Sequence, residues 1–140
     1  MAAIHPVETQ IFASDQHPGA VRQTKESLEG ADVSSLVELQ QTDFFKLEPR
    51  TTKGMLLFNP PYGERMDPGD IVGLYKRIGD QLKFHWSGFD AWIISSNDEA
   101  LRRVGLRPHK RHPVYNGALE CRWVGFSMYR GRKADQYKKQ

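Results

Sequence analysis

One short stretch of this sequence has residue types and spacing that could hold an amine: Asn59-Pro60-Pro61-Tyr62. It follows an unbroken apolar run at residues 54–58, which predicts a strand buried on both faces. Two consecutive prolines cannot donate to a sheet, so we expect the strand to end here, at the sheet edge where open α/β sheets bind ligands. The Asn59 side-chain carbonyl and the Pro60 backbone carbonyl could orient an exocyclic NH2 group, and Tyr62 offers a flat face for stacking a base. A simpler interpretation is a proline-terminated strand followed by a turn tyrosine.

The elements that must position this stretch alternate along the chain between strand and helix patterns. Hydrophobic spacing predicts strands at residues 10–15, 36–43, 54–58 and 89–96. Helices are predicted to begin at Pro18 and at Asp67-Pro68, and a third, short helix is capped by Asn97. The Asn116-Gly117 pair predicts a hairpin between strands at residues 107–116 and 119–129. Such alternation favours a mostly parallel sheet with crossover helices.

The longer stretch Asn59-Pro60-Pro61-Tyr62-Gly63-Glu64-Arg65 resembles motif IV of the S-adenosylmethionine (SAM)-dependent amino methyltransferases that act on nucleic acid. In this form it is similar to the bacterial 23S ribosomal RNA guanine-N2 methyltransferases that carry a THUMP RNA-binding domain. The Tyr115-Asn116-Gly117 turn, followed by Leu119-Glu120-Cys121, resembles the same family at a second, distant site. The resemblance implies an α/β fold of the Rossmann-like class I methyltransferase type, with a mostly parallel sheet and a C-terminal antiparallel hairpin.

The resemblance also implies roles for individual residues. For the cofactor SAM, it implies that Asp15 accepts hydrogen bonds from the ribose hydroxyls, that Asp43 binds the adenine amino group, and that Phe44 packs on the adenine ring. The implied catalytic residues are Asn59, Pro60, Pro61 and Tyr62, and Asn59 also belongs to the cofactor site. The implied substrate-binding residues are Tyr62, Arg65, Tyr115 and Asn116. Read without the resemblance, Asp15 is a helix N-cap, Asp43 is a turn residue and Phe44 belongs to the core.

In the family, a strand and a Gly-rich loop (motif I) come before the ribose-binding acid. No Gly-x-Gly-like turn lies before Asp15. We therefore expect residues 1–130 to form a partial catalytic domain, with the first strand and the Gly-rich loop missing. An upstream segment of the same protein is expected to supply motif I and a THUMP domain. Without the missing strand, the strands that end at Asp15 and Asn59 should each keep an exposed edge. Residues 131–140 are polar and basic, and they predict a disordered tail.

Composition and charge restrict the class of protein further. The chain has 140 residues and a net charge of +3, which suits one soluble domain, and no segment approaches the length of a membrane span. The first ten residues lack the basic start and the apolar stretch of a signal peptide, so the expected compartment is the cytoplasm. Cys121 is the only cysteine and the five histidines form no ligand cluster, so no metal site is expected. From residue 102 onward only Glu120 and Asp135 oppose eleven basic residues, at positions 102, 103, 107, 110, 111, 122, 130, 132, 133, 138 and 139. This basic block could face phosphates, or it could be a solvated surface.

The resulting functional prediction is transfer of a methyl group from SAM to the N2 amine of a guanine in ribosomal RNA. An adenine-N6 or protein-glutamine methyltransferase is an alternative, since both use a similar Asn-Pro-Pro-Tyr turn on a planar amine. A third alternative is an RNA-binding module without catalysis, which would hold RNA by charge and stacking alone.

Overall fold

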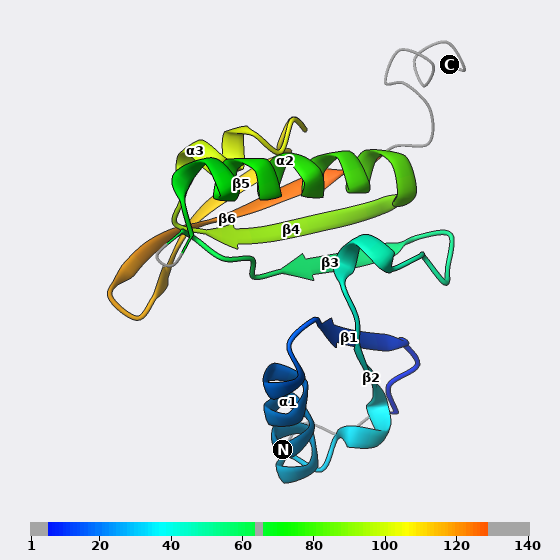
Figure 1. Cartoon of the computed structure of the whole chain (residues 1–140). Helices are drawn as coiled ribbons and strands as arrows, with labels where there is room; N and C mark the ends of the chain where they lie inside the picture. The colour runs from blue at the N-terminus through cyan, green and yellow to red at the C-terminus, as the bar shows by residue number, and fades with distance from the viewer. Residues whose placement is uncertain (1–5, 64–65, 129–140) are drawn as a thin grey trace, which may run out of the picture. The chain divides into compact units, whose positions relative to one another are not determined.

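The computed structural model describes residues 6–63 and 66–128 of the chain. It divides into two compact units, residues 1–47 and residues 48–140, and each is described by itself (Figure 1).

The first unit is a β-α-β arrangement. Strand β1 (Ile11–Asp15) is followed by helix α1 (Pro18–Gly30) and by strand β2 (Val37–Gln41), with short 3-10 segments η1 (Ser34–Leu36) and η2 (Phe44–Lys46) on either side of β2. The two strands pair in parallel, from Ile11 opposite Val37 to Asp15 opposite Gln41. Pro18 lies in the first turn of α1, where its missing N–H costs nothing. The predicted strands and helix of this unit are confirmed to within two residues at each end.

The second unit contains a four-stranded mixed sheet. Its elements are β3 (Gly54–Phe58), α2 (Pro68–His85), β4 (Phe89–Ser95), α3 (Asp98–Arg102), β5 (Lys110–Asn116) and β6 (Leu119–Ser127). The strand order is β3-β4-β6-β5. Strands β3 and β4 are parallel, whereas β6 runs antiparallel to both β4 and β5. The predicted C-terminal hairpin is confirmed, and Gly117 in its turn has a φ of 63°, which glycine adopts without strain.

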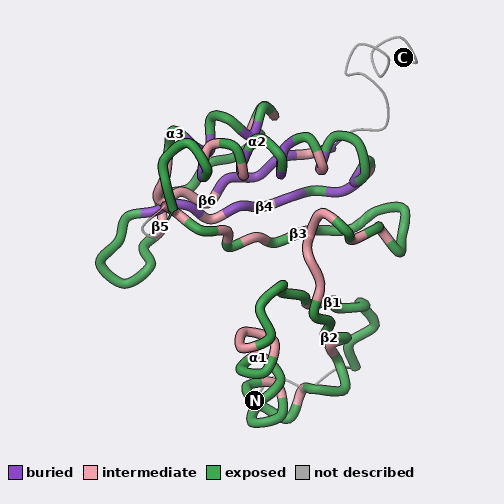
Figure 2. Tube along the Cα trace, viewed as in Figure 1, coloured by how far each residue is buried: buried purple, intermediate pink, exposed green. Residues whose placement is uncertain are grey.

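Helix α2 and the strands β4 and β6 supply most of the buried core (Figure 2). The buried face of α2 carries Ile71, Tyr75, Ile78 and Leu82, which recur at helical spacing. Gly79 lies on the same face, and a Cβ at this position would lie 1.7 Å from the carbonyl oxygen of Val104. The absence of a side chain at Gly79 therefore lets α2 contact the backbone that follows α3.

The prediction that residues 54–58 are buried on both faces is wrong for this structure. Strand β3 is at the edge of its sheet, and Met55 and Leu57 are 63% and 66% exposed. They pair with Asp90 and Trp92, whereas Leu56 pairs with the fully buried Ala91. Alternate residues of β3 therefore face the covered side of the sheet, and among the described residues of this unit no helix covers the other side (Figure 1). The short strand ending at Asp15 is likewise not buried, since its residues are exposed or half-buried.

Exposed strand edges are confirmed for both strands that were expected to have them. Among the described residues, β1 pairs only with β2 and β3 pairs only with β4. Each therefore keeps one row of backbone N–H and C=O groups that is not part of a ladder.

Candidate functional site

The turn after β3 places Asn59 and Tyr62 in direct contact. The Tyr62 hydroxyl donates a hydrogen bond to Asn59 Oδ1 across 2.8 Å. Asn59 is exposed and Tyr62 is half-buried, so the amide group of Asn59 can meet a ligand. The turn closes at Gly63, whose φ of 112° lies in the region that favours glycine.

The backbone of this turn is fixed by side chains from two other elements. The Tyr75 hydroxyl, from α2, donates to the Pro61 carbonyl across 2.8 Å. Asn97 Nδ2, from the residue that caps α3, donates to the Tyr62 carbonyl across 3.2 Å. The predicted capping role of Asn97 is also confirmed, because its Oδ1 accepts from the Ala100 N–H.

Ser95 links these two side chains. Its hydroxyl lies 2.7 Å from the Tyr75 hydroxyl and accepts from the Asn97 backbone N–H across 3.1 Å. A carbonyl oxygen can only accept, so the single hydroxyl proton of Tyr75 goes to Pro61, and Ser95 must donate to Tyr75. The hydrogen bonds therefore run in one direction, from Asn97 through Ser95 and Tyr75 to the carbonyl of Pro61. We call Tyr75, Ser95 and Asn97 the turn-holding network.

Burial widens the pH range over which Tyr75 stays protonated and can donate a hydrogen bond. Desolvation raises the pKa of the Tyr75 phenol to about 12, and the hydrogen bond from Ser95 opposes this only in part. At neutral pH the hydroxyl therefore holds the Pro61 carbonyl as a neutral donor.

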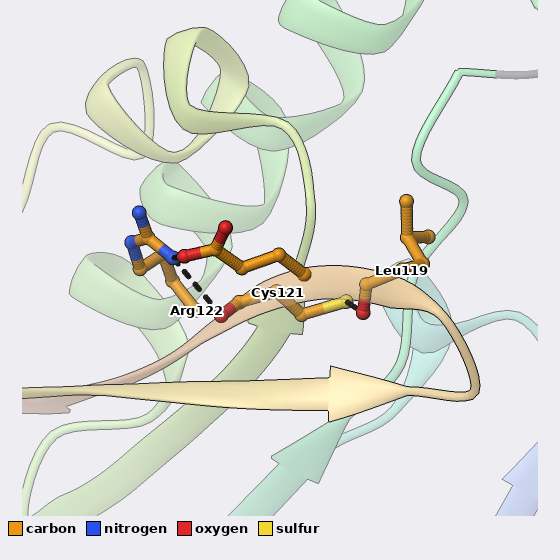
Figure 3. Close-up of polar contacts among 4 residues, drawn as sticks. Leu119, Cys121 and Arg122 are labelled. Carbon is orange, nitrogen blue, oxygen red and sulfur yellow. Dashed lines mark hydrogen bonds and ion pairs between the residues drawn. The ribbon is translucent and has the colours of Figure 1, made fainter.

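The C-terminal hairpin contributes a second contact to Tyr62. Desolvation and the neighbouring Cys121 raise the pKa of the Tyr62 phenol, while a hydrogen bond with the Asn116 side chain lowers it. Cys121 is fully buried, and its thiol lies 3.7 Å from the Leu119 carbonyl (Figure 3). Beside it, Arg122 Nη1 binds the Glu120 carboxylate across 2.9 Å on the hairpin (Figure 3). Cys121 is thus a small buried packing residue next to Tyr62.

The predicted substrate-binding residues differ in whether they contact this turn. Asn116 joins Asn59 and Tyr62, whereas the Tyr115 side chain is 70% exposed. Arg65 lies outside the described residues, as does the predicted tail at residues 131–140.

The predicted cofactor residues of the first unit lie at the carboxyl ends of its two parallel strands. Asp15 Oδ1 accepts from the His17 N–H across 2.8 Å, and Asp43 Oδ1 accepts from the Phe45 N–H across 2.9 Å. The Thr42 N–H donates to the Asp15 carbonyl, which brings the two strand ends side by side. The Phe44 ring lies next to that of Phe45, with 5.5 Å between ring centres. Asp43 caps η2, and Asp15 forms a local turn in front of α1, whose N-cap residue is His17.

Sequence reasoning missed Tyr75 and Ser95 as part of the site. Helical spacing places Tyr75 on the apolar face of the helix that begins at Pro68, and Ser95 falls within the predicted strand at residues 89–96. The contact between Tyr75 and Pro61 joins residues 14 positions apart and has no sequence signal. Asn97 did carry a signal, but as a helix cap.

No group of three or more His, Cys, Asp or Glu residues within residues 6–63 and 66–128 could hold a metal ion. In the same ranges, no helix has the length and apolar character needed to cross a membrane.

Comparisons with known proteins identify a family and several relatives of this chain. The family described as RMKL-like, methyltransferase domain, matches residues 1–125. The ribosomal RNA large subunit methyltransferase K/L of Vibrio parahaemolyticus is 34% identical over 139 residues, which cover 96% of this chain and 19% of that protein. The protein of the same name from Syntrophotalea carbinolica is 35% identical over 119 residues, covering 81% of this chain and 17% of that protein. The chain therefore spans less than a fifth of the length of these two relatives.

A solved structure supports the fold. The protein SMU.472, crystallised with SAH, matches with a TM-score of 0.78 at 23% identity, over 87% of this chain and 32% of that chain. The similarity shows a methyltransferase-type α/β fold, as predicted.

Proposed function

This chain belongs to the RMKL-like methyltransferase domain family, and on that basis we propose that it is part of an enzyme that methylates ribosomal RNA. The specific reaction proposed is transfer of a methyl group from SAM to the exocyclic N2 amine of a guanine. The names of the two relatives, ribosomal RNA large subunit methyltransferase K/L, support ribosomal RNA as the substrate.

The observation that carries the proposal is the amide of Asn59 at the end of β3. Its Oδ1 already accepts a hydrogen bond from a hydroxyl at 2.8 Å, so the oxygen is oriented as an acceptor towards a donor on the Tyr62 side. An exocyclic NH2 is also a donor, and it can replace that hydroxyl at Oδ1 while its second N–H reaches the Pro60 carbonyl. Two such bonds would fix the plane of the amine and direct the nitrogen lone pair towards the methyl group.

Tyr62 and Asn116 lie where they could hold the base that carries the amine. Tyr62 is half-buried against Cys121 and keeps a ring available for stacking. Asn116 contacts the Tyr62 hydroxyl and can hydrogen-bond the base edge once that hydroxyl moves. Arg65 and Tyr115 complete the proposed substrate contacts, the first through phosphate or base oxygens and the second through its exposed ring.

The hydrogen-bond acceptors of the first unit support SAM as the proposed cofactor. Asp15 and Asp43 each use one carboxylate oxygen for a local backbone N–H, and a carboxylate has a second oxygen for a ligand donor. A ribose diol and an adenine amino group are such donors, and the half-buried Phe44 offers an apolar surface for the adenine ring. SAM would supply an electrophilic methyl group when bound. The chain's own residues would position the amine, which accounts for most of the catalysis in a direct transfer.

The proposal includes two elements from other parts of the protein. A Gly-rich loop would complete the cofactor site, and a THUMP domain would deliver the RNA.

The proposed compartment is the cytoplasm. The proposed domain boundary places the catalytic part at residues 1–130.

The test is a methyl-transfer assay with isotope-labelled SAM and matched RNA oligonucleotides. One oligonucleotide carries guanosine and the other carries inosine at the same position, since inosine lacks only the N2 amine. The assay is run on this chain and on a chimera in which the chain replaces the matching segment of the Vibrio parahaemolyticus relative. Label in guanosine RNA but not in inosine RNA supports the proposal. Label in both, or label only in adenine-containing DNA or in protein, contradicts the N2 assignment, and no transfer by either protein contradicts the enzyme assignment.

A further inference from the structure

The Asn59–Tyr62 turn contains two prolines and follows an edge strand, so hydrogen bonds within the sheet do little to fix the position of the turn. Proline supplies no N–H, and β3 ends at Phe58, before the turn. The turn is nevertheless fixed at two successive carbonyls, Pro61 and Tyr62, by hydrogen bonds of 2.8 Å and 3.2 Å. Both donors come from elements outside the turn.

Burial restricts where the hydroxyls of Tyr75 and of its partner Ser95 can lie. Tyr75 and Ser95 have no exposed surface, so each of their hydroxyls depends on a protein partner. Tyr75 lies in the middle of α2, and Ser95 is the last residue of β4. The helix, the neighbouring strand and the cap of α3 thus meet at the turn through one directional chain of hydrogen bonds.

We propose that Tyr75, Ser95 and Asn97 are positioning residues that set where the Asn59 amide and the Pro60 carbonyl present themselves to the substrate amine. This inference rests on the proposed function for its catalytic consequence, but its structural part does not. None of the three touches the reacting atoms; they act through the carbonyls of Pro61 and Tyr62. A small displacement of the turn would misdirect both acceptors together, because they are joined by one rigid Pro-Pro segment.

Two variants remove single bonds from the network. Tyr75→Phe removes the hydroxyl that holds Pro61 and keeps the ring in the core. Asn97→Asp keeps the oxygen that accepts from Ala100 N–H, so the cap of α3 is retained, but it removes the donor to the Tyr62 carbonyl. Glu99→Gln is the matched control, since Glu99 is exposed and lies on the same short helix.

The first measurement is steady-state kinetics of methyl transfer, normalised to folded protein. A displacement of about 1 Å can lower a rate about 10²-fold, and we expect a fall in kcat of this order for Tyr75→Phe with a KM for SAM within about twofold of wild type. Glu99→Gln should have the kinetics of the wild type. A folded Tyr75→Phe protein with normal kcat overturns the proposal, because a merely structural role would lower stability and leave kcat per folded molecule unchanged.

The second measurement does not depend on activity. In NMR spectra, the side-chain amide of Asn59 and the ring of Tyr62 should shift or broaden in Tyr75→Phe and in Asn97→Asp, and should not change in Glu99→Gln. If the wild type transfers no methyl group, the proposed function fails, and these signals still decide whether the network positions the turn. Unchanged signals at Asn59 and Tyr62 in both variants overturn the positioning role.

Discussion

The hydroxyl of Tyr62 occupies the acceptor of Asn59 at 2.8 Å. The two residues to which the proposed function assigns the amine and the base are therefore hydrogen-bonded to each other in this structure. In the proposed reaction the substrate amine would share Asn59 Oδ1 with this hydroxyl or displace it, since an amide oxygen has two lone pairs, so the ring and the hydroxyl of Tyr62 can be tested separately.

Tyr62→Phe should lower the KM for RNA, or leave it unchanged, because it frees Asn59 Oδ1 and keeps the stacking surface. Tyr62→Ala removes the ring and should weaken RNA binding by about 1–3 kcal/mol, the typical contribution of one base–aromatic stack. Binding is measured by fluorescence titration of labelled RNA and the KM by the transfer assay. Equal losses in the two variants would show that the hydroxyl, not the ring, holds the substrate.

Asn59→Ala should abolish methyl transfer while the protein stays folded, since Asn59 is exposed and its side chain contributes no core packing. The measurement pairs the transfer assay with circular dichroism and a thermal unfolding curve. Glu99→Gln again serves as the control. A well-folded Asn59→Ala protein that still methylates RNA would exclude Asn59 from catalysis.

The stability of the protein should fall at alkaline pH because of Tyr75. Its pKa is about 12 in the folded state against an ordinary value of 10, so the unfolded chain loses this proton first as the pH rises. The stabilisation is fully present below pH 10 and decreases as the pH rises towards about 12. Urea unfolding at several pH values should therefore give a steeper alkaline loss for wild type than for Tyr75→Phe.

Tyr115→Phe is the control for this experiment, because it removes a hydroxyl from a side chain that is 70% exposed instead of from the core. Its alkaline stability curve should run parallel to that of the wild type. If Tyr75→Phe also runs parallel, the buried hydroxyl does not titrate as proposed.

Two glycines in α2 should respond in opposite directions to alanine. In Gly79→Ala the new Cβ would lie 1.7 Å from the Val104 carbonyl oxygen, so α2 must move, and we expect a loss of about 3 kcal/mol in the free energy of unfolding. A Cβ added at Gly73 would have nothing within 4 Å, so Gly73→Ala should stabilise the helix by about 0.5–1 kcal/mol. Chemical unfolding of the two variants measures both values. An unchanged free energy of unfolding for Gly79→Ala would mean that α2 is not tightly packed against the Val104 backbone.

The strands β1 and β2 should open more easily than β4 and β6. No described residue of the first unit is buried, and a two-stranded sheet has little stability of its own. Hydrogen exchange should therefore be faster for the amides of β1 and β2 than for those of β4 and β6. If Asp15 and Asp43 bind SAM, adding SAM should slow exchange at these strand ends, and equal protection throughout the chain would contradict the first expectation.

Local sequence signals determined most of the secondary structure. The apolar run and the two prolines set the bounds of β3, the Pro18 and Pro68 positions set the starts of α1 and α2, and Asn116-Gly117 set the hairpin. These signals are local because proline lacks an N–H, glycine tolerates positive φ, and a helix cap acts within one turn. The Asn59-Pro60-Pro61-Tyr62 stretch also identified the family from sequence, because its residue types are chemically specific.

The tertiary structure alone decided what surrounds that stretch. An apolar run looks the same whether one or both faces are covered, so sequence could not show that Met55 and Leu57 are exposed. The Tyr62–Asn59 hydrogen bond depends on the shape of the turn, and the contacts of Tyr75, Ser95 and Asn97 depend on how α2 and β4 pack. Such contacts join residues distant in sequence, and no local spacing records them. The sequence therefore predicted the chemistry of the acceptor, whereas only the tertiary structure showed which contacts hold that acceptor in place.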